Sequence, residues 1–192
     1  VLAPALGLQA RLTWPERHLL AAERALGELG IRPGKRPEPT PCFAPWGSRE
    51  PGLLGVSPGA GWDTKRWPVE HFRELLALWP GPSVVFGAAD EQELVASVGG
   101  EVWGDSSLVG LAAGLSRCGV VVAGDTGPLH LGAALGARVV ALFGPTPVNT
   151  GFWTWESQGS LLRAEDLSCS PCSMHGRRSC PRGHHRCMRA LS

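Results

Sequence analysis

Residues 119–144 have the sequence GVVVAGDTGPLHLGAALGARVVALFG, in which two short apolar runs flank one helical window. The runs at 119–124 and 138–144 predict strands, and the window near 128–136 predicts a helix. Continuous apolar strands that alternate with helices are typical of a parallel sheet covered on both faces. This stretch therefore predicts an α/β fold.

The same alternation extends toward the N-terminal side of this stretch. Apolar runs at 53–57 and 83–87 predict strands, and helices are predicted near 69–79, 90–98 and 107–117. Two of these helices carry apolar stripes at helical spacing, which predict core contacts. The stripes are Phe72, Leu75, Leu76 and Trp79, and Leu108, Leu111, Ala112 and Leu115. We expect a Rossmann-like domain over 53–165, with helices on both faces of the sheet.

Residues 1–52 follow a different pattern. Residues 16–30 predict an amphipathic helix that ends at Gly30. Residues 32–52 predict a surface linker, because six prolines interrupt the stretch and no apolar periodicity runs through it. These prolines are Pro33, Pro37, Pro39, Pro41, Pro45 and Pro51.

Composition narrows the class of protein. A chain of 192 residues is long enough for one well-buried domain with attached pieces. Its net charge of +1 provides no overall field that would attract nucleic acid or anionic lipid. The sequence contains no apolar stretch of about 20 residues and begins with no signal-peptide pattern. We therefore expect a cytoplasmic protein that binds no nucleic acid.

The loop SPGAGWDTKRWP at 57–68 is the first candidate for ligand binding. It follows a predicted strand, and ligands of open parallel sheets bind outside the carboxyl ends of the strands. Gly59 and Gly61 allow the backbone to approach a ligand closely, and Lys65 and Arg66 would attract an anion such as a diphosphate. The alternative is a glycine turn with two solvated cations.

The segment GDTGPLHLGAALG at 124–136 is the second candidate. Asp125 or Thr126 is predicted to cap a helix with Pro128 in its first turn, and His130 lies one turn further. The free N–H groups and the dipole at such a helix start favour phosphate. The turn FGPTP at 143–147 could form a wall of the same crevice.

Four blocks of the sequence together resemble a known family. They are SPGAGWDTKRWPVEHF, FGAADE, GDTGPLHLGAALGARVVALFGPT and the cysteine-rich end CSPC…CPRGHHRCM. In this order they resemble the C-terminal half of glycosyltransferase family 9, the ADP-heptose:lipopolysaccharide heptosyltransferases, over roughly residues 53–190. The resemblance implies one half of a GT-B architecture, with the nucleotide-sugar donor bound in this half.

The resemblance also implies roles for individual residues. Lys65 would contact the donor phosphates or sugar, Asp125 would lie near the sugar, and the backbone of Thr126 and Gly127 would bind the diphosphate beside His130. Glu91 would accept hydrogen bonds from the ribose hydroxyls, and Asp90 is its close competitor. Ala60 and Gly61 replace the family's pair of hydroxyl-bearing residues, which weakens the inference that the sugar is a heptose.

The family inverts the anomeric carbon, and its catalytic base comes from the N-terminal, acceptor-binding half. The resemblance implies that this half is missing, with residues 1–52 as its remnant, so no catalytic residue is assigned. A glycan or lipopolysaccharide acceptor would place the protein near the inner-membrane surface. No cofactor is expected for catalysis. The alternatives are a nucleotide-binding fragment without transferase activity and a zinc-stabilised binding module.

The basic C-terminal segment, residues 166–192, contains Cys169, Cys172, Cys180 and Cys187 in a C-x2-C-x7-C-x6-C pattern. A CxxC pair followed by two further cysteines is compatible with structural zinc, and a reducing cytoplasm disfavours disulfides. Structural metal, disulfides and free thiols all remain open. Cys118 and Cys42 look unpaired, and Cys118 is expected in the core.

Overall fold

The structure is a computed structural model that describes residues 48–148 and 159–191. Of the described residues, 48–146 and 159–191 belong to one compact unit. Its strands are β1 (Glu50–Ser57), β2 (Ser83–Val85), β3 (Glu101–Val102), β4 (Cys118–Gly124), β5 (Arg138–Phe143) and β6 (Gly159–Arg163). Its α-helices are α2 (Val69–Leu78), α3 (Gln92–Val98), α4 (Leu108–Arg117), α5 (Gly127–Ala134) and α6 (Arg186–Arg189), with 3-10 helices η2 (Asp63–Lys65) and η3 (Ala89–Glu91).

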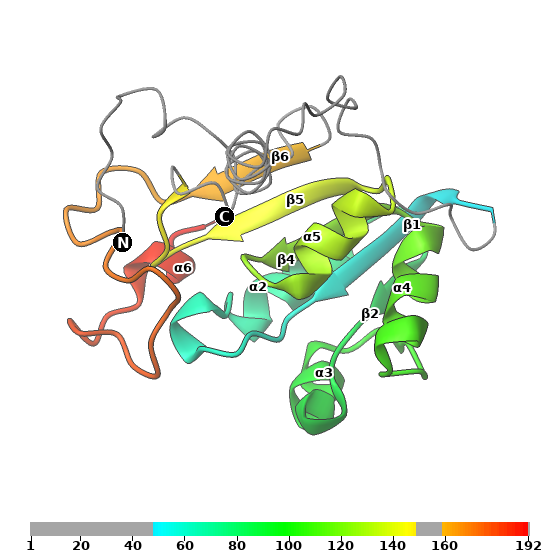
Figure 1. Ribbon diagram of the computed structural model, residues 1–192, viewed down its shortest axis with the longest axis horizontal. Coiled ribbons are helices and arrows are strands. Elements are labelled where there is room, and N and C mark those ends of the chain that lie inside the picture. Colours follow the sequence, from blue (N-terminus) through cyan, green and yellow to red (C-terminus); the bar gives the residue numbers. More distant parts are fainter. Residues whose placement is uncertain (1–47, 149–158, 192) are drawn as a thin grey trace, which may run out of the picture. The chain divides into compact units, whose positions relative to one another are not determined.

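The six strands form one sheet in the order β3-β2-β1-β4-β5-β6, and every neighbouring pair is parallel (Figure 1). The chain builds the sheet outward from β1 through β2 to β3, and then returns to the other side of β1 for β4. The strand order therefore reverses between β1 and β4. In open sheets of this kind, the carboxyl ends of the two strands at such a reversal open a crevice for ligands.

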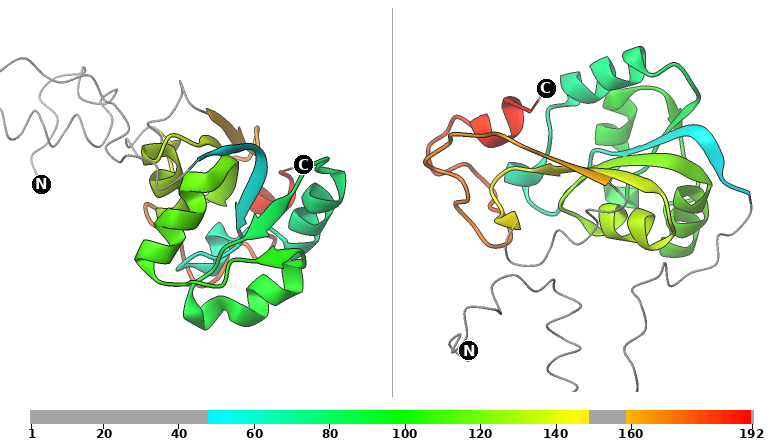
Figure 2. Two further views of the ribbon diagram at one scale, coloured as in Figure 1. Left: turned by 90° about the vertical axis from the view of Figure 1, so that its right-hand side faces the viewer. Right: turned by 90° about the horizontal axis from the view of Figure 1, so that it is seen from above.

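Helices cover both faces of the sheet, as the alternating sequence pattern predicts. Figure 2 shows α2 on one face and α4 with α5 on the other. Helices α2 and α3 pack against each other, as do α4 and α5. One core cluster joins Leu54 and Val122 of the sheet to Phe72 of α2 and to Met188 of α6, so the C-terminal segment shares the main core. The predicted Rossmann-like fold is confirmed.

The predicted strands and helices match the structure closely, and the differences are confined to ends and edges. Strand β1 begins at Glu50, so the predicted linker at 32–52 is wrong for its last three residues. Strands β3 and β6 were not predicted, because β3 has only two residues, both exposed, and β6 alternates between half-buried and exposed positions. The predicted helix at 16–30 and most of the linker lie outside the described residues.

One predicted core residue is exposed. In α4, Leu115 is fully buried and Ala112 is 9% exposed, whereas Leu108 is 74% exposed. Leu108 is the first residue of the helix, and the buried positions of α4 begin at Gly110, so the first residue of the stripe does not reach the core. Within the described residues, no helix is both long and apolar enough to cross a membrane.

The two leucines of α4 provide a matched test of this packing. Leu115→Ala should lower the free energy of unfolding by about 2–5 kcal/mol, because it leaves a cavity in the core. Leu108→Ala should change it by less than about 0.5 kcal/mol, because that side chain is largely solvated. Urea denaturation of both variants measures the difference, and equal losses would contradict the assignment of Leu108 to the surface.

Candidate functional site

Lys65 and Asp125 meet at the carboxyl edge of the sheet, where the strand order reverses. Lys65 is the last residue of η2 in the loop after β1, and Asp125 directly follows β4. Lys65 Nζ lies 2.9 Å from Asp125 Oδ2, and the two side chains are 14% and 8% exposed. A charge buried to this degree is stable only when it is paired, so the contact fixes the positions of the two loops relative to each other.

His130, near the start of α5, lies beside this pair. Its Nε2 lies 3.7 Å from Asp125 Oδ1, so the carboxylate of Asp125 lies between Lys65 and His130. Burial by itself raises the pKa of Asp125. The His130 ring 3.7 Å away, the hydrogen bond and charge of Lys65 and the nearby Thr146 hydroxyl outweigh it and lower that pKa to about 2. Asp125 is therefore a carboxylate throughout the neutral range.

The start of α5 differs from the predicted capping arrangement. Thr126 is the N-cap residue, but its hydroxyl donates to the carbonyl of Gly124 at 3.2 Å and makes no side-chain cap. Asp125 instead turns toward Lys65. The Thr126 side chain thus accepts no hydrogen bond from the first N–H groups of α5, the groups that favour an anion at a helix start.

A cavity of about 360 Å³ extends from the start of α5 across the carboxyl ends of β1 and β2. Its size falls in the range of small-molecule sites. It is mainly apolar at the end formed by Phe86, Trp103, Leu108 and Leu111, and Glu91, Thr126 and Gly127 line it elsewhere. The complete lining is Ser57, Gly59, Ala60, Gly61, Phe86, Gly87, Ala88, Glu91, Trp103, Asp105, Ser106, Leu108, Leu111, Thr126, Gly127 and Pro128.

Glu91 reaches across this cavity toward the loop after β1. Its Oε2 accepts a hydrogen bond from the backbone N–H of Ala88 at 3.1 Å, which fixes the carboxylate at the rim. A Cβ at Gly59 would collide with this carboxylate, so the close approach of the two segments requires glycine there. Asp90, the predicted competitor, is exposed and is not part of the lining.

Arg66 is not the solvated cation of the alternative interpretation. Its Nε and Nη2 donate to the carbonyl of Ala60 at 3.2 and 3.0 Å, and its Nη1 pairs with Asp63 at 3.0 Å. Arg66 therefore ties the start of the 57–68 loop to its end and fixes the glycine turn that lines the cavity.

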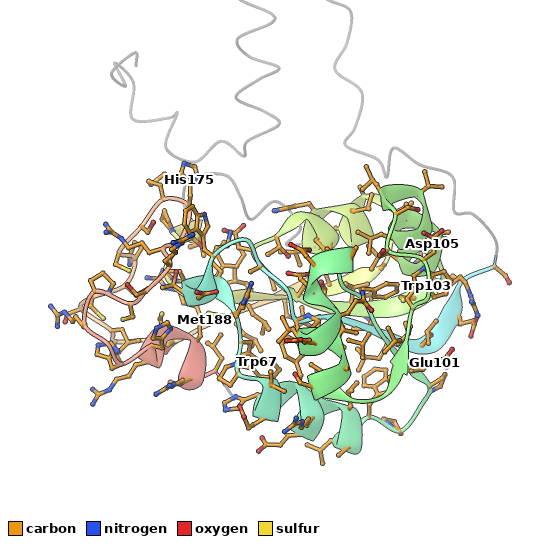
Figure 3. The ribbon with its side chains drawn as sticks, turned by 90° about the horizontal axis from the view of Figure 1, so that it is seen from below. Trp67, Glu101, Trp103, Asp105, His175 and Met188 are labelled. Atoms are coloured by element: carbon orange, nitrogen blue, oxygen red, sulfur yellow. The ribbon has the colours of Figure 1, made fainter. Side chains whose placement is uncertain are left out.

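The aromatic end of the cavity and Thr146 were missed by sequence reasoning. Trp103, which Figure 3 labels, lines the cavity and directly follows strand β3. Because this strand was not predicted, the position of Trp103 at the end of a strand was not recognised from the sequence. Thr146 was predicted only as part of a turn. Its hydroxyl is buried beside Asp125 and, among the described side chains, is the buried polar group that makes no hydrogen bond of normal geometry.

The four C-terminal cysteines line a second cavity of about 230 Å³, together with His184. All four are free thiols, and Cys169 Sγ lies 3.8 Å from His184 Nε2. Burial, together with the neighbouring thiols, raises the pKa of Cys187 to about 11. In the described part of the chain, no three His, Cys, Asp or Glu side chains are already spaced to hold a metal ion. A metal would thus require the thiols to draw together, and the zinc site stays a prediction.

Cys118 is confirmed as a core residue. Its side chain is fully buried at the start of β4, and its Sγ donates to the carbonyl of Gly114 at 3.4 Å. Burial raises the pKa of this thiol to about 12, so it is unreactive at neutral pH. Cys42 lies outside the described residues.

Comparison with known proteins identifies the family of this chain. The sequence model of glycosyltransferase family 9 (heptosyltransferase) matches residues 27–180, which is most of the chain. The chain belongs to glycosyltransferase family 9. This family 9 chain is 29% identical over 153 residues to lipooligosaccharide heptosyltransferase 2 of Campylobacter jejuni, covering 72% of the chain and 47% of that protein.

Two further comparisons concern the extent of the likeness. Over 123 residues the family 9 chain is 35% identical to lipopolysaccharide heptosyltransferase 1 of Pseudomonas aeruginosa, covering 59% of the chain and 34% of that protein. A structure of an E. coli heptosyltransferase with ADP-2-deoxy-2-fluoro heptose superposes with a TM-score of 0.62 at 23% identity, covering 85% of the chain and 54% of that structure. The chain thus spans about half the length of the relatives it matches first, and the last comparison supports the fold alone.

The depressed pKa of Asp125 predicts a pH-dependent contribution to stability. The folded pKa of about 2 lies below the ordinary 3.8, so the contribution is complete above the ordinary value and is lost as the pH falls toward 2. Asp125→Asn should lower the free energy of unfolding by about 2 kcal/mol at pH 6, and the deficit should shrink by about 1 kcal/mol at pH 3. Urea denaturation at both pH values measures this change.

The exposed Asp90 provides the control for this experiment. Asp90→Asn should leave the free energy of unfolding nearly unchanged at both pH values, because that carboxyl is solvated. A deficit for Asp125→Asn of the same size at pH 6 and pH 3 would contradict the ion-paired carboxylate.

Proposed function

We propose that this chain binds the nucleotide-sugar donor, an ADP-linked heptose or a similar sugar, for inverting transfer to lipopolysaccharide or another glycan. The observation that carries the proposal is the Lys65–Asp125–His130 cluster, which adjoins the cavity of about 360 Å³ through Thr126 but does not line it. The names of the relatives support the substrate class, because they are heptosyltransferases of lipooligosaccharide and lipopolysaccharide.

The nucleoside occupies the apolar end of the cavity. Phe86 and Trp103 lie with ring centroids 5.9 Å apart and form an aromatic wall for a flat base. Glu91 lies on the same cavity, where its carboxylate can accept hydrogen bonds from ribose hydroxyls. This placement leaves the diphosphate directed toward Thr126 and Gly127.

The diphosphate lies between the start of α5 and Lys65. The N–H groups at the helix start and the helix dipole favour a negative group there, and the ammonium group of Lys65, which is paired with Asp125, would also contact the phosphates. The same contacts would stabilise the diphosphate as it leaves the sugar, which is where negative charge develops during transfer. The Asp125 carboxylate would then face the sugar.

The base that activates the acceptor is proposed to come from outside the described residues, as the family resemblance implies. The acceptor half and the membrane proximity follow the same resemblance and are also proposed. The cytoplasmic location, which we expect from the sequence, is a further proposal. A chain that binds the donor without transferring it is the second candidate. Calorimetry with ADP, combined with an assay for sugar release from ADP-heptose, separates binding from turnover.

Calorimetric titration of the purified chain with ADP tests the donor site. Saturable binding is expected, and Lys65→Met should weaken it by about 10- to 100-fold, because a charge-assisted hydrogen bond contributes about 1.5–3 kcal/mol. Arg138→Met removes a cation that is exposed at the start of β5, at the opposite, amino edge of the sheet, and should leave the affinity unchanged.

The two outcomes that would overturn this proposal are distinct. Absence of ADP binding by the unaltered chain would remove the donor-site function altogether. Equal affinity of the Lys65→Met and Arg138→Met variants would keep nucleotide binding but refute the role of Lys65 at the phosphates.

For the cysteine segment, the proposal is one structural zinc ion per chain, held by Cys169, Cys172, Cys180 and Cys187. Its support is that all four thiols line one cavity. Zinc would stabilise the fold of the segment and take no part in transfer.

Elemental analysis of protein purified without added metal should give one zinc per chain, and chelation should expose four thiols to a thiol reagent. Cys118 provides an internal control, since it is buried and should stay unreactive until the protein unfolds. A metal-free protein whose four thiols react at once would refute the zinc site.

A further inference from the structure

The cysteine-rich segment contacts both of the loops that flank Asp125. One loop carries Lys65 after β1, and the other is the turn after β5 that carries Thr146. Residues 170–177, which we call the brace, form hydrogen bonds with each loop. These hydrogen bonds belong neither to the donor site that the resemblance implies nor to the cavity lined by the cysteines.

The contact with the Lys65 loop centres on Thr64. This residue is 3% exposed, and its backbone N–H donates to the carbonyl of Arg177 at 3.2 Å. Its hydroxyl donates to the same carbonyl at 2.9 Å and accepts from the backbone N–H of Arg177 at 2.8 Å. Thr64, the residue before Lys65, thus hydrogen-bonds both the backbone N–H and the backbone carbonyl of Arg177 in the brace.

Gly176 lies directly against the stem of Lys65. A Cβ built on Gly176 would come within 2.9 Å of Lys65 Cδ and 2.8 Å of Trp62 Cβ. Its φ of +104° is in the region that favours glycine. Ser173 holds this turn, because its hydroxyl donates to the carbonyl of Gly176 at 2.9 Å and accepts from the N–H of Gly176 at 3.0 Å.

The other end of the brace holds the turn after β5. The backbone N–H groups of Cys172 and Ser173 donate to the carbonyl of Pro145 at 2.9 and 3.1 Å. The hydroxyl of Ser170 donates to the carbonyl of Gly144 at 2.7 Å. One short segment thus fixes the loops on both sides of the buried carboxylate.

We infer that the brace sets the position of the Lys65 ammonium group, with Thr64 as the positioning residue, and thereby sets the affinity for the phosphates of a bound nucleotide. The inference rests on the proposed donor function for its ligand. The nucleoside end of the cavity lies apart from the brace, since no residue of 170–177 lines it. Figure 3 shows Trp103 and Asp105 on one side of the molecule and His175, within the brace, on the other.

This separation makes the inference testable with two ligands. Thr64→Val keeps the shape of the side chain but removes the hydroxyl and both of its hydrogen bonds. The ADP affinity should fall by about tenfold, the order expected for a charge-assisted contact. The adenosine affinity should not change, and Thr64→Ser should restore ADP binding because it restores the hydroxyl.

Ser116→Ala is the matched control. Ser116 is fully buried in α4, and its hydroxyl donates to the carbonyl of Ala113 at 2.8 Å, far along the chain from the brace. This variant also loses a buried hydroxyl, so it should lower the melting temperature while leaving both affinities unchanged. Parallel losses for ADP and adenosine in Thr64→Val would indicate general destabilisation and overturn the inference.

A readout without nucleotide decides the inference even if ADP does not bind. Lys35 and Lys65 are the only lysines of the chain, so their modification by formaldehyde and borohydride can be followed separately by mass spectrometry. The rate ratio of Lys65 to Lys35 should rise several-fold in Thr64→Val, because the ammonium leaves its sheltered position beside Asp125. An unchanged ratio would refute the inference that the brace positions Lys65. Absence of ADP binding together with a raised ratio would refute only the proposed function.

Discussion

The ion pair between Lys65 and Asp125 is the contact on which the site depends. The two residues are 60 positions apart in the chain and meet only because β4 returns to pair with β1. A buried carboxylate is costly unless a cation and hydrogen bonds offset its desolvation. Asp125 therefore fixes where Lys65 must be, and the loops after β1 and β4 can occupy few other arrangements. The helix start, the cavity and the brace are all arranged around this pair.

The interior of the fold could be predicted from the sequence because its signals are local. Buried parallel strands such as β4 appear as continuous apolar runs, and α2 shows its buried face through helical spacing. Strands β3 and β6 lie at the two edges of the sheet formed by the described residues, where apolar runs are not required. Leu108 was misplaced for a related reason, because spacing shows which face of a helix is apolar but not which of its turns packs on the core.

The site was predicted in part, since the carboxyl ends of parallel strands must meet at one edge of the sheet. This rule brought together the loops that carry Lys65, Glu91 and Asp125 before any contact was known. It could not distinguish a capping carboxylate from an ion-paired one, because that choice depends on Lys65 in a distant loop. Thr146 and Trp103 depend in the same way on tertiary contacts, and the packing of the C-terminal segment on Thr64 has no signal in either stretch alone.

The charges around Asp125 explain why the position of Lys65 matters as well as its presence. Lys65 and Asp125 together are neutral, so a diphosphate approaching the start of α5 meets no net attraction from the pair. The ammonium group must stay close enough to Asp125 to screen its repulsion and close enough to the phosphates to attract them. Coulomb energies change steeply over such distances in a partly desolvated site. A segment that limits the movement of the Lys65 loop thereby acts on the balance between these two interactions, although it contacts no ligand itself.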